Sequence, residues 1–181
     1  MDIGGGSIEF IIGTNDKAEW MHSFEIGGLR LLEKFHKNDP ITSEEISSIE
    51  HFLEVELDLL FKVCEEYNLD TLIGSSGTFD TLSDIFRLNA GIENLPGDTE
   101  YPLPVEAYRR ISADLIKKTR SERMKIPGMI ELRVEMIVVA TILINYVVNR
   151  LNIKHLRVSA YALKEGVLLN TIQALKDRQL Y

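Results

Sequence analysis

The stretch DIGGGSIE, residues 2–9, gathers an aspartate, three glycines, a serine and a glutamate. Successive glycines let a backbone approach a ligand closely, and consecutive N–H groups can then bind phosphate oxygens. The candidate phosphate ligands of this stretch are Gly4, Gly5, Gly6 and Ser7. Asp2 could hold a divalent metal ion, and Ser7 and Glu9 fall on one face of the strand that follows. A plain tight hairpin is the alternative, but the flanking acids and serine favour a phosphate site.

A second glycine-rich turn follows a short apolar run and precedes a predicted helix. Its candidate phosphate ligands are Gly74, Ser75, Ser76, Gly77 and Thr78. The start of a helix offers free N–H groups and the positive end of the helix dipole, so this turn could close over a nucleotide or another anion. The alternative is a structural helix cap made by Ser76 or Thr78.

A third stretch, residues 126–135, places polar side chains at the start of an apolar segment. Arg133 and Glu135 open the helix that is predicted there. An arginine in this position could reach a phosphate group, because its planar fork of donors matches phosphate geometry. The alternative is a surface ion pair in the first turn of the helix.

The elements that must position these side chains follow from the pattern of apolar residues. Alternating runs at 7–12 and 19–26, joined by turn residues at 13–16, predict a β-hairpin. Thr42 and Glu45 have the spacing of a capping box, which predicts one long helix ending near Asn68. Further helices are predicted at 29–35, 79–88, 105–118, 120–125, 131–151 and 162–175, strands at 1–3, 71–73 and 155–159, and a loop at 94–104. This order predicts an α/β fold in which helices flank a mixed sheet.

Composition excludes several classes of function. The chain has 181 residues, 45% of them hydrophobic, and a formal net charge of −8, which argues against a nucleic-acid partner. Cys64 is the single cysteine, so no internal disulfide is expected and a cytoplasmic location is favoured. The sequence has no signal-peptide pattern, and its most apolar segment, residues 134–148, is too short to cross a membrane.

Together these stretches resemble the exopolyphosphatase and guanosine pentaphosphate phosphohydrolase (Ppx/GppA) family, within the superfamily of actin-like ATPases, sugar kinases and heat-shock ATPases. Residues 2–9 resemble its second phosphate motif, and residues 74–78 resemble the glycine-threonine motif that follows a later strand. Residues 127–135 resemble the start of its arginine-containing helix, and residues 158–166 its closing strand and helix. Glu135 stands where that family usually has aspartate.

The resemblance implies two ribonuclease-H-like lobes with an active site between them. The first lobe carries a phosphate motif and a catalytic glutamate that have no counterpart in this sequence. The chain therefore resembles the second lobe alone, a single domain over residues 1–181, and no catalytic residue is expected within it. By this resemblance Asp2 and Glu9 would hold Mg²⁺ or another divalent cation, the first glycine stretch would bind phosphate oxygens, and water would attack the terminal phosphoryl group of polyphosphate or a guanosine polyphosphate.

Three other functions remain open at this stage. The chain could be the nucleotide-binding half of a related kinase, a non-catalytic module that binds polyphosphate or guanosine tetraphosphate, or a purely structural domain. The sheet is expected to contain the hairpin and the strands near 71–74 and 156–158. Because the opening strand is almost absent, unpaired backbone groups are expected near the centre of the sheet, and such edges favour dimerisation.

Overall fold

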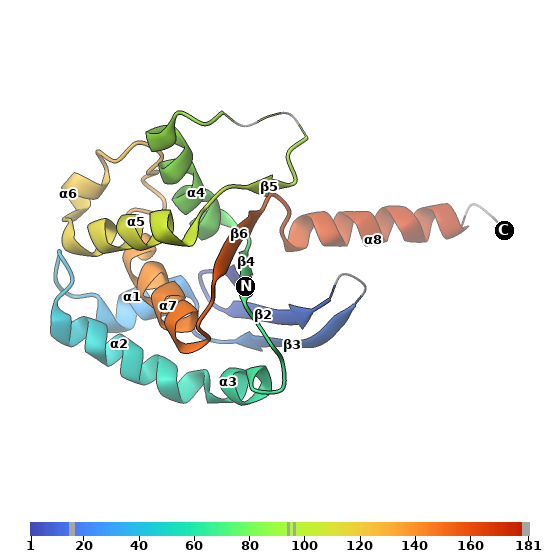
Figure 1. The fold of residues 1–181 in the computed structure, drawn as a ribbon, viewed down its shortest axis with the longest axis horizontal. Coiled ribbons are helices and arrows are strands. Elements are labelled where there is room, and N and C mark those ends of the chain that lie inside the picture. The colour runs from blue at the N-terminus through green and yellow to red at the C-terminus, as the bar shows by residue number, and fades with distance from the viewer. Residues whose placement is uncertain (15–16, 94, 96, 179–181) are drawn as a thin grey trace.

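The computed structural model describes residues 1–14, 17–93, 95 and 97–178, and it has the α/β architecture that the sequence predicts (Figure 1). The strands are β1 (Asp2–Ile3), β2 (Ile8–Gly13), β3 (Ala18–Phe24), β4 (Thr71–Gly74), β5 (Glu100–Tyr101) and β6 (His155–Ser159). The helices are α1 (Gly28–Phe35), α2 (Ser43–Glu56), α3 (Asp58–Cys64), α4 (Gly77–Ala90), α5 (Val105–Lys117), α6 (Arg120–Arg123), α7 (Met136–Arg150) and α8 (Leu163–Arg178).

The strands form two three-stranded sheets that meet at the N-terminus of the chain. One sheet is antiparallel with the order β1-β2-β3, and the other has the order β4-β6-β5, in which β4 and β6 are parallel. A single parallel bridge between Asp2 and Ser75 joins them. The Ser75 N–H group donates to the Met1 carbonyl at 3.0 Å, and the Met1 amino group donates to the Ile73 carbonyl at 2.9 Å. The expected central sheet is therefore present, but only this short junction makes it continuous.

A cavity of about 890 Å³ is lined by residues of β1, β2, β3 and β4. Phe10, Ile12 and Leu72 contribute to its apolar lining. Beyond Glu9, β2 pairs only with β3 among the described residues, so the expected unpaired backbone edge is observed. Burial lowers the pKa of the Met1 amino group, which lies at this cavity, to about 6. Dimerisation through these edges stays a prediction.

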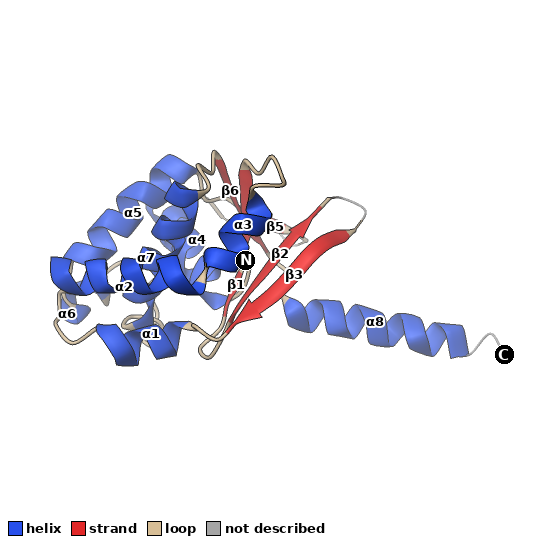
Figure 2. Cartoon of the chain, turned by 90° about the horizontal axis from the view of Figure 1, so that it is seen from below, coloured by secondary structure: helices blue, strands red, loops and turns tan. Residues whose placement is uncertain are grey.

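Helix α7 forms the centre of the hydrophobic core. Every residue from Met136 to Ile144 is buried, and α1, α2 and α5 pack around the helix (Figures 1 and 2). Burying one large aliphatic side chain contributes about 1.5–3 kcal/mol, so the buried residues of this helix make a large contribution to the stability of the fold. It was predicted as a buried helix but with the wrong start, because residues 131–135 form turns and α7 begins at Met136.

Other local predictions succeed or fail for identifiable reasons. The capping box is confirmed: the Glu45 N–H group donates to Thr42 Oγ1 at 3.3 Å, and the Thr42 N–H group donates to Glu45 Oε2 at 2.8 Å. The single long helix is wrong, because buried Leu57 leaves the helical conformation and separates α2 from α3. Strand β5 falls within the predicted loop, where it pairs with β6. Two turn residues of the hairpin, Asn15 and Asp16, and two loop residues, Asn94 and Pro96, lie outside the described residues.

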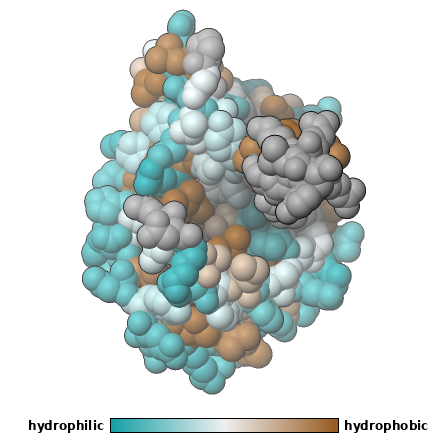
Figure 3. Space-filling view, turned by 90° about the vertical axis from the view of Figure 1, so that its right-hand side faces the viewer, coloured by the Kyte–Doolittle hydropathy of each residue, from teal (hydrophilic) through white to brown (hydrophobic). Residues whose placement is uncertain are grey.

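Helix α8 projects away from the rest of the molecule (Figures 1 and 2). The predicted apolar side chains Val167, Leu168 and Ile172 are exposed, and the side chain of Leu163 is outside the described part. Figure 3 faces this side of the molecule and shows apolar residues at its surface among polar ones. In the described part of the chain, no helix combines the length and the apolar character needed to span a bilayer.

We predict that His36 makes the stability of the fold depend on pH. Burial lowers the pKa of His36 below its ordinary value near 6.5, Arg123 lowers it further, and Asp39 and Glu45 oppose the shift. As the pH falls through about 6.5, the unfolded chain binds a proton that the folded chain does not yet bind. The free energy of unfolding in urea should therefore decrease between pH 7.5 and pH 5.5, and this decrease should become smaller in His36→Phe. An equal decrease in both proteins would contradict the prediction.

Candidate functional site

The first glycine stretch forms a tight connection between β1 and β2 that packs on the start of α1. The Gly4 N–H group donates to the Ser7 carbonyl at 3.0 Å. The carbonyls of Gly4, Gly5 and Gly6 accept from the N–H groups of Gly28, Leu29 and Gly27 at 2.8, 3.0 and 3.2 Å, respectively. These bonds fix the stretch through its carbonyl groups. Its N–H groups at Gly5 and Gly6 donate to no other described residue, which suits a phosphate cradle.

Asp2 and Glu9 face each other across the first strand pair. They are direct partners in the antiparallel register, so their side chains lie on the same face of the sheet. Glu9 Oε1 accepts from Ser7 Oγ at 2.6 Å and from Ser23 Oγ at 2.7 Å, which confirms that Ser7 and Glu9 share a face. Burial raises the pKa of Asp2, hydrogen bonds from Ser76 and Ser75 oppose the shift, and the charge of Glu9 adds to it.

The second glycine turn lies next to this pair of acids because Ser75 bridges to Asp2. Ser76 has φ of +75°, a left-handed value that is strained for a residue with a side chain. Its carbonyl accepts from the Phe79 and Asp80 N–H groups, but its side chain makes no capping bond to α4. Thr78 is fully buried and its hydroxyl has no partner among the described residues. The structural-cap alternative therefore lacks its expected side-chain hydrogen bond.

Arg133 lies against the same turn rather than at the start of a helix. A Cβ atom at Gly77 would stand 2.3 Å from Arg133 Nη2, so a side chain at this position would push the guanidinium away from the turn. Arg133 Nε is buried without a hydrogen-bond partner among the described residues. The ion pairs of this segment are made by the neighbours of Arg133: Glu131 and Glu135 each pair with Arg120 at 3.2 Å.

Two polar residues join the site that the sequence analysis did not single out. One is Ser23, which binds Glu9 from β3. The other is Asp80, in the first turn of α4: burial raises its pKa, the nearby acids Asp84 and Asp2 act in the same direction, and Lys164 and Arg133 oppose them. An aspartate two residues after the Gly77-Thr78 pair, at the second position of the helix predicted over 79–88, was the available signal for Asp80.

The predicted residues are brought together unequally. Asp2, Glu9 and Ser75 line the 890 Å³ cavity, whereas the remaining candidates lie outside its lining. The described residues contain no group of three or more histidine, cysteine, aspartate or glutamate side chains that could hold a metal ion. The Asp2–Glu9 pair nevertheless suits Mg²⁺, which retains several waters and is commonly held by one or two carboxylates together with substrate phosphates.

Comparison with known proteins identifies the family. The model of the "Ppx/GppA phosphatase family" matches residues 1–175. The chain belongs to this family. It is 27% identical over 179 residues to exopolyphosphatase 1 of Mycobacterium leprae, an alignment that covers 98% of this chain and 52% of the relative. It is 23% identical over 180 residues to a guanosine-5'-triphosphate,3'-diphosphate pyrophosphatase of Photobacterium profundum, covering 99% of this chain and 35% of that protein.

Solved structures of the family share the fold. The crystal structure of an exopolyphosphatase from Cytophaga hutchinsonii superposes with a TM-score of 0.89 at 40% identity, covering 96% of this chain and 56% of that one. The Aquifex aeolicus family member superposes with a TM-score of 0.78 at 28% identity, covering 96% and 55%. The chain thus spans about half the length of these structures and of the mycobacterial relative.

We predict that Gly27 cannot be replaced by a residue with a side chain, because it packs against the backbone of the first glycine stretch. A Cβ atom there would stand 2.4 Å from the Gly5 carbonyl carbon and oxygen, which are backbone atoms that cannot rotate away. Gly27→Ala should lower the free energy of unfolding by about 2–3 kcal/mol, as measured in urea. Gly6→Ala is the matched control, because a Cβ atom at Gly6 meets nothing within 4 Å. Equal losses in the two variants would contradict this account of the packing.

Proposed function

We propose that this chain is the second, ribonuclease-H-like lobe of a hydrolase that cleaves terminal phosphoanhydride bonds of polyphosphate or of a guanosine polyphosphate. The observation that carries the proposal is the bridge between Asp2 and Ser75, which brings the two glycine turns and the acid pair to one place. Family membership supports the reaction class, since relatives bear the names of an exopolyphosphatase and a guanosine polyphosphate pyrophosphatase.

The roles of the residues follow from their positions. The N–H groups of Gly5 and Gly6 and those at the start of α4, from Gly77, would bind oxygens of the phosphoryl group, with Arg133 as a further ligand. The Gly4 N–H group, which the sequence analysis included, is already bonded to the Ser7 carbonyl. Asp2 and Glu9 would hold Mg²⁺, which when bound supplies positive charge against the phosphate oxygens. Ser7 and Ser23 orient Glu9 through their hydroxyl groups. Catalysis of phosphoryl transfer consists mainly of such positioning and charge stabilisation.

The attack of water requires a general base, and we assign none to this chain. By resemblance to the family, that base is a glutamate of the other lobe. The cytoplasm is the proposed location, in keeping with a single cysteine that forms no disulfide.

Binding of phosphate chains should depend on the acid pair. We expect inorganic tripolyphosphate to bind the 181-residue chain saturably in the presence of Mg²⁺, as measured by calorimetry. Asp2→Asn or Glu9→Gln should weaken this binding by at least about tenfold. Replacing a residue that only hydrogen-bonds a metal ligand already lowers metal affinity by about 10- to 100-fold, and these substitutions would remove a ligand itself. Glu19→Gln is the matched control, because Glu19 is an acid of the same hairpin that pairs only with Lys17 among the described residues. Unchanged binding in both site variants would favour a purely structural domain.

Turnover should require the other lobe. The chain alone should release no phosphate from polyphosphate with Mg²⁺, because a bound phosphoryl group has no base to activate water against it. Joining it to the first half of a family member should restore release, measured as free phosphate. Release by the chain alone that disappears in Asp2→Ala would refute this division of roles. Saturable binding without release in the joined protein would instead indicate a binding module, and transfer to an acceptor would indicate a kinase.

A further inference from the structure

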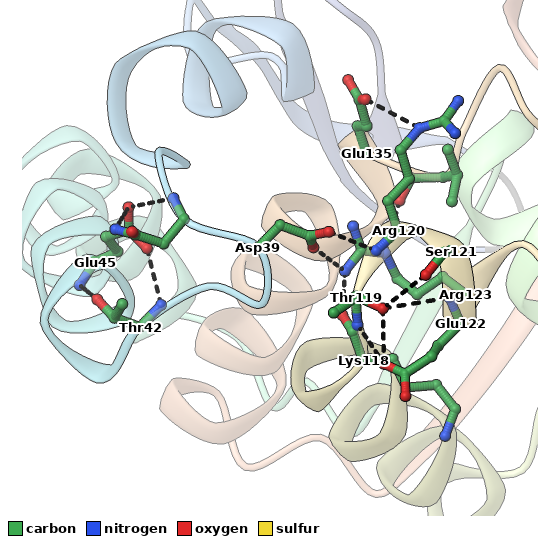
Figure 4. A network of polar contacts seen from close by, with 12 residues as sticks. Asp39, Thr42, Glu45, Lys118, Thr119, Arg120, Ser121, Glu122, Arg123 and Glu135 are labelled. Atoms are coloured by element: carbon green, nitrogen blue, oxygen red, sulfur yellow. Dashed lines mark hydrogen bonds and ion pairs between the residues drawn. The ribbon is translucent and has the colours of Figure 1, made fainter.

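A buried arginine on the short helix α6, Arg123, bonds residues outside that helix (Figure 4). Arg123 is 1% exposed, and a buried guanidinium is destabilising unless its donors are satisfied. Its Nη1 lies 3.0 Å from Asp39 Oδ1 and also donates to the Lys118 carbonyl. Its Nε donates to the Val134 carbonyl at 2.9 Å, which connects α6 to the turn before α7.

The second arginine of α6 holds the same turn from the outside. Arg120 Nε bonds Glu135 Oε1 and Arg120 Nη2 bonds Glu131 Oε1, each at 3.2 Å. The Arg120 N–H group donates to Asp39 Oδ2 at 2.6 Å, so Asp39 links the two arginines (Figure 4). Residues 131–135 have no regular helical structure of their own. The arginines of α6 bond this turn at Glu131, at Glu135 and at the Val134 carbonyl.

Arg133 lies in the middle of this turn. Its N–H group donates to the Ile130 carbonyl at 3.0 Å, and its carbonyl accepts from the Ile137 N–H group at 2.8 Å. Its guanidinium contacts the position of Gly77, at the start of α4. An arginine side chain is long and flexible, so a fixed backbone on both sides limits where its guanidinium can lie.

We propose that Asp39, Arg120 and Arg123 are positioning residues, which hold the 131–135 turn so that the Arg133 guanidinium stays at the start of α4. The expected effect of these three residues on phosphate binding rests on the proposed function, in which Arg133 binds phosphate. Their effect on the position of Arg133 is independent of that function. The network also gives a role to Glu135, which stands where the family usually has aspartate: its carboxylate accepts from Arg120.

The test measures the position of Arg133 and the binding of phosphate separately. The first readout is the ¹H–¹⁵N signal of Arg133 Nε–H, assigned by its loss in Arg133→Lys. In Arg123→Lys we expect this signal to shift and to exchange faster with solvent. The second readout is the affinity for inorganic tripolyphosphate with Mg²⁺, which should fall about tenfold in Arg123→Lys because small displacements of a charged ligand reduce binding strongly. In an Arg133→Met background the same substitution should leave the affinity unchanged, although it still lowers the melting temperature.

Tyr108→Phe is the matched control for lost stability. It removes a buried hydroxyl that bonds Asn145 Oδ1 at 2.8 Å and the Thr141 carbonyl at 3.2 Å, and it does not touch the 131–135 turn. This variant should melt earlier with an unchanged Arg133 signal and unchanged affinity. If Arg123→Lys does not fold, Arg120→Gln provides the same comparison, because the Arg120 side chain is 44% exposed.

An unchanged Arg133 signal in a folded Arg123→Lys or Arg120→Gln protein would overturn the proposal and leave the network a role in stability alone. An affinity loss that persists in the Arg133→Met background would overturn it as well, since the arginines would then act by another route. If the signal moves but the wild-type chain binds no tripolyphosphate, the positioning role stands and the proposed function fails.

Discussion

The bridge between Asp2 and Ser75 is the contact on which the candidate site depends. It is a single backbone pairing, yet it joins two sheets and places two glycine turns side by side. Each turn connects to a separate part of the fold: hydrogen bonds join the first to the start of α1, and the second leads through the left-handed backbone of Ser76 into α4. Without the bridge, the acid pair and the start of α4 would lie on two sheets with no backbone pairing between them among the described residues. A short junction can do this because the helices around α7 hold both sheets through one continuous hydrophobic core.

Close backbone approach explains why glycine recurs around the site. At Gly27 a side chain would meet the backbone of the first turn, and at Gly77 it would meet the Arg133 guanidinium. The two positions differ in kind. Gly27 allows two backbone segments to touch, which is a packing requirement, while Gly77 allows a charged side chain to lie over the first turn of a helix. The second arrangement places a cation where the helix already favours anions, so the two effects act in the same direction.

The sequence predicted the parts of this structure that local pattern determines. The shared face of Ser7 and Glu9, the Thr42–Glu45 capping box and the buried character of α7 follow from spacing within a few residues. Contacts between distant residues were not predictable in this way. The break at Leu57 and the pairing of β5 with β6 depend on partners elsewhere in the fold. Arg133 was singled out as a polar residue near an apolar helix, but neither its contact with Gly77 nor the bonds of the two α6 arginines to the 131–135 turn follow from a local pattern.

The charges of the site constrain how the proposed function can operate. The chain carries a formal net charge of −8, and Asp2, Glu9 and Asp80 lie near the turns that would receive a phosphate chain. Like charges at short range are unfavourable, so a polyanion cannot approach these acids unless cations compensate them. Arg133 compensates on the side of α4, and the Asp2–Glu9 pair has the carboxylates that a divalent cation requires. In the proposed function, phosphate affinity and metal affinity would therefore be linked, because each bound partner would remove the repulsion that opposes the other.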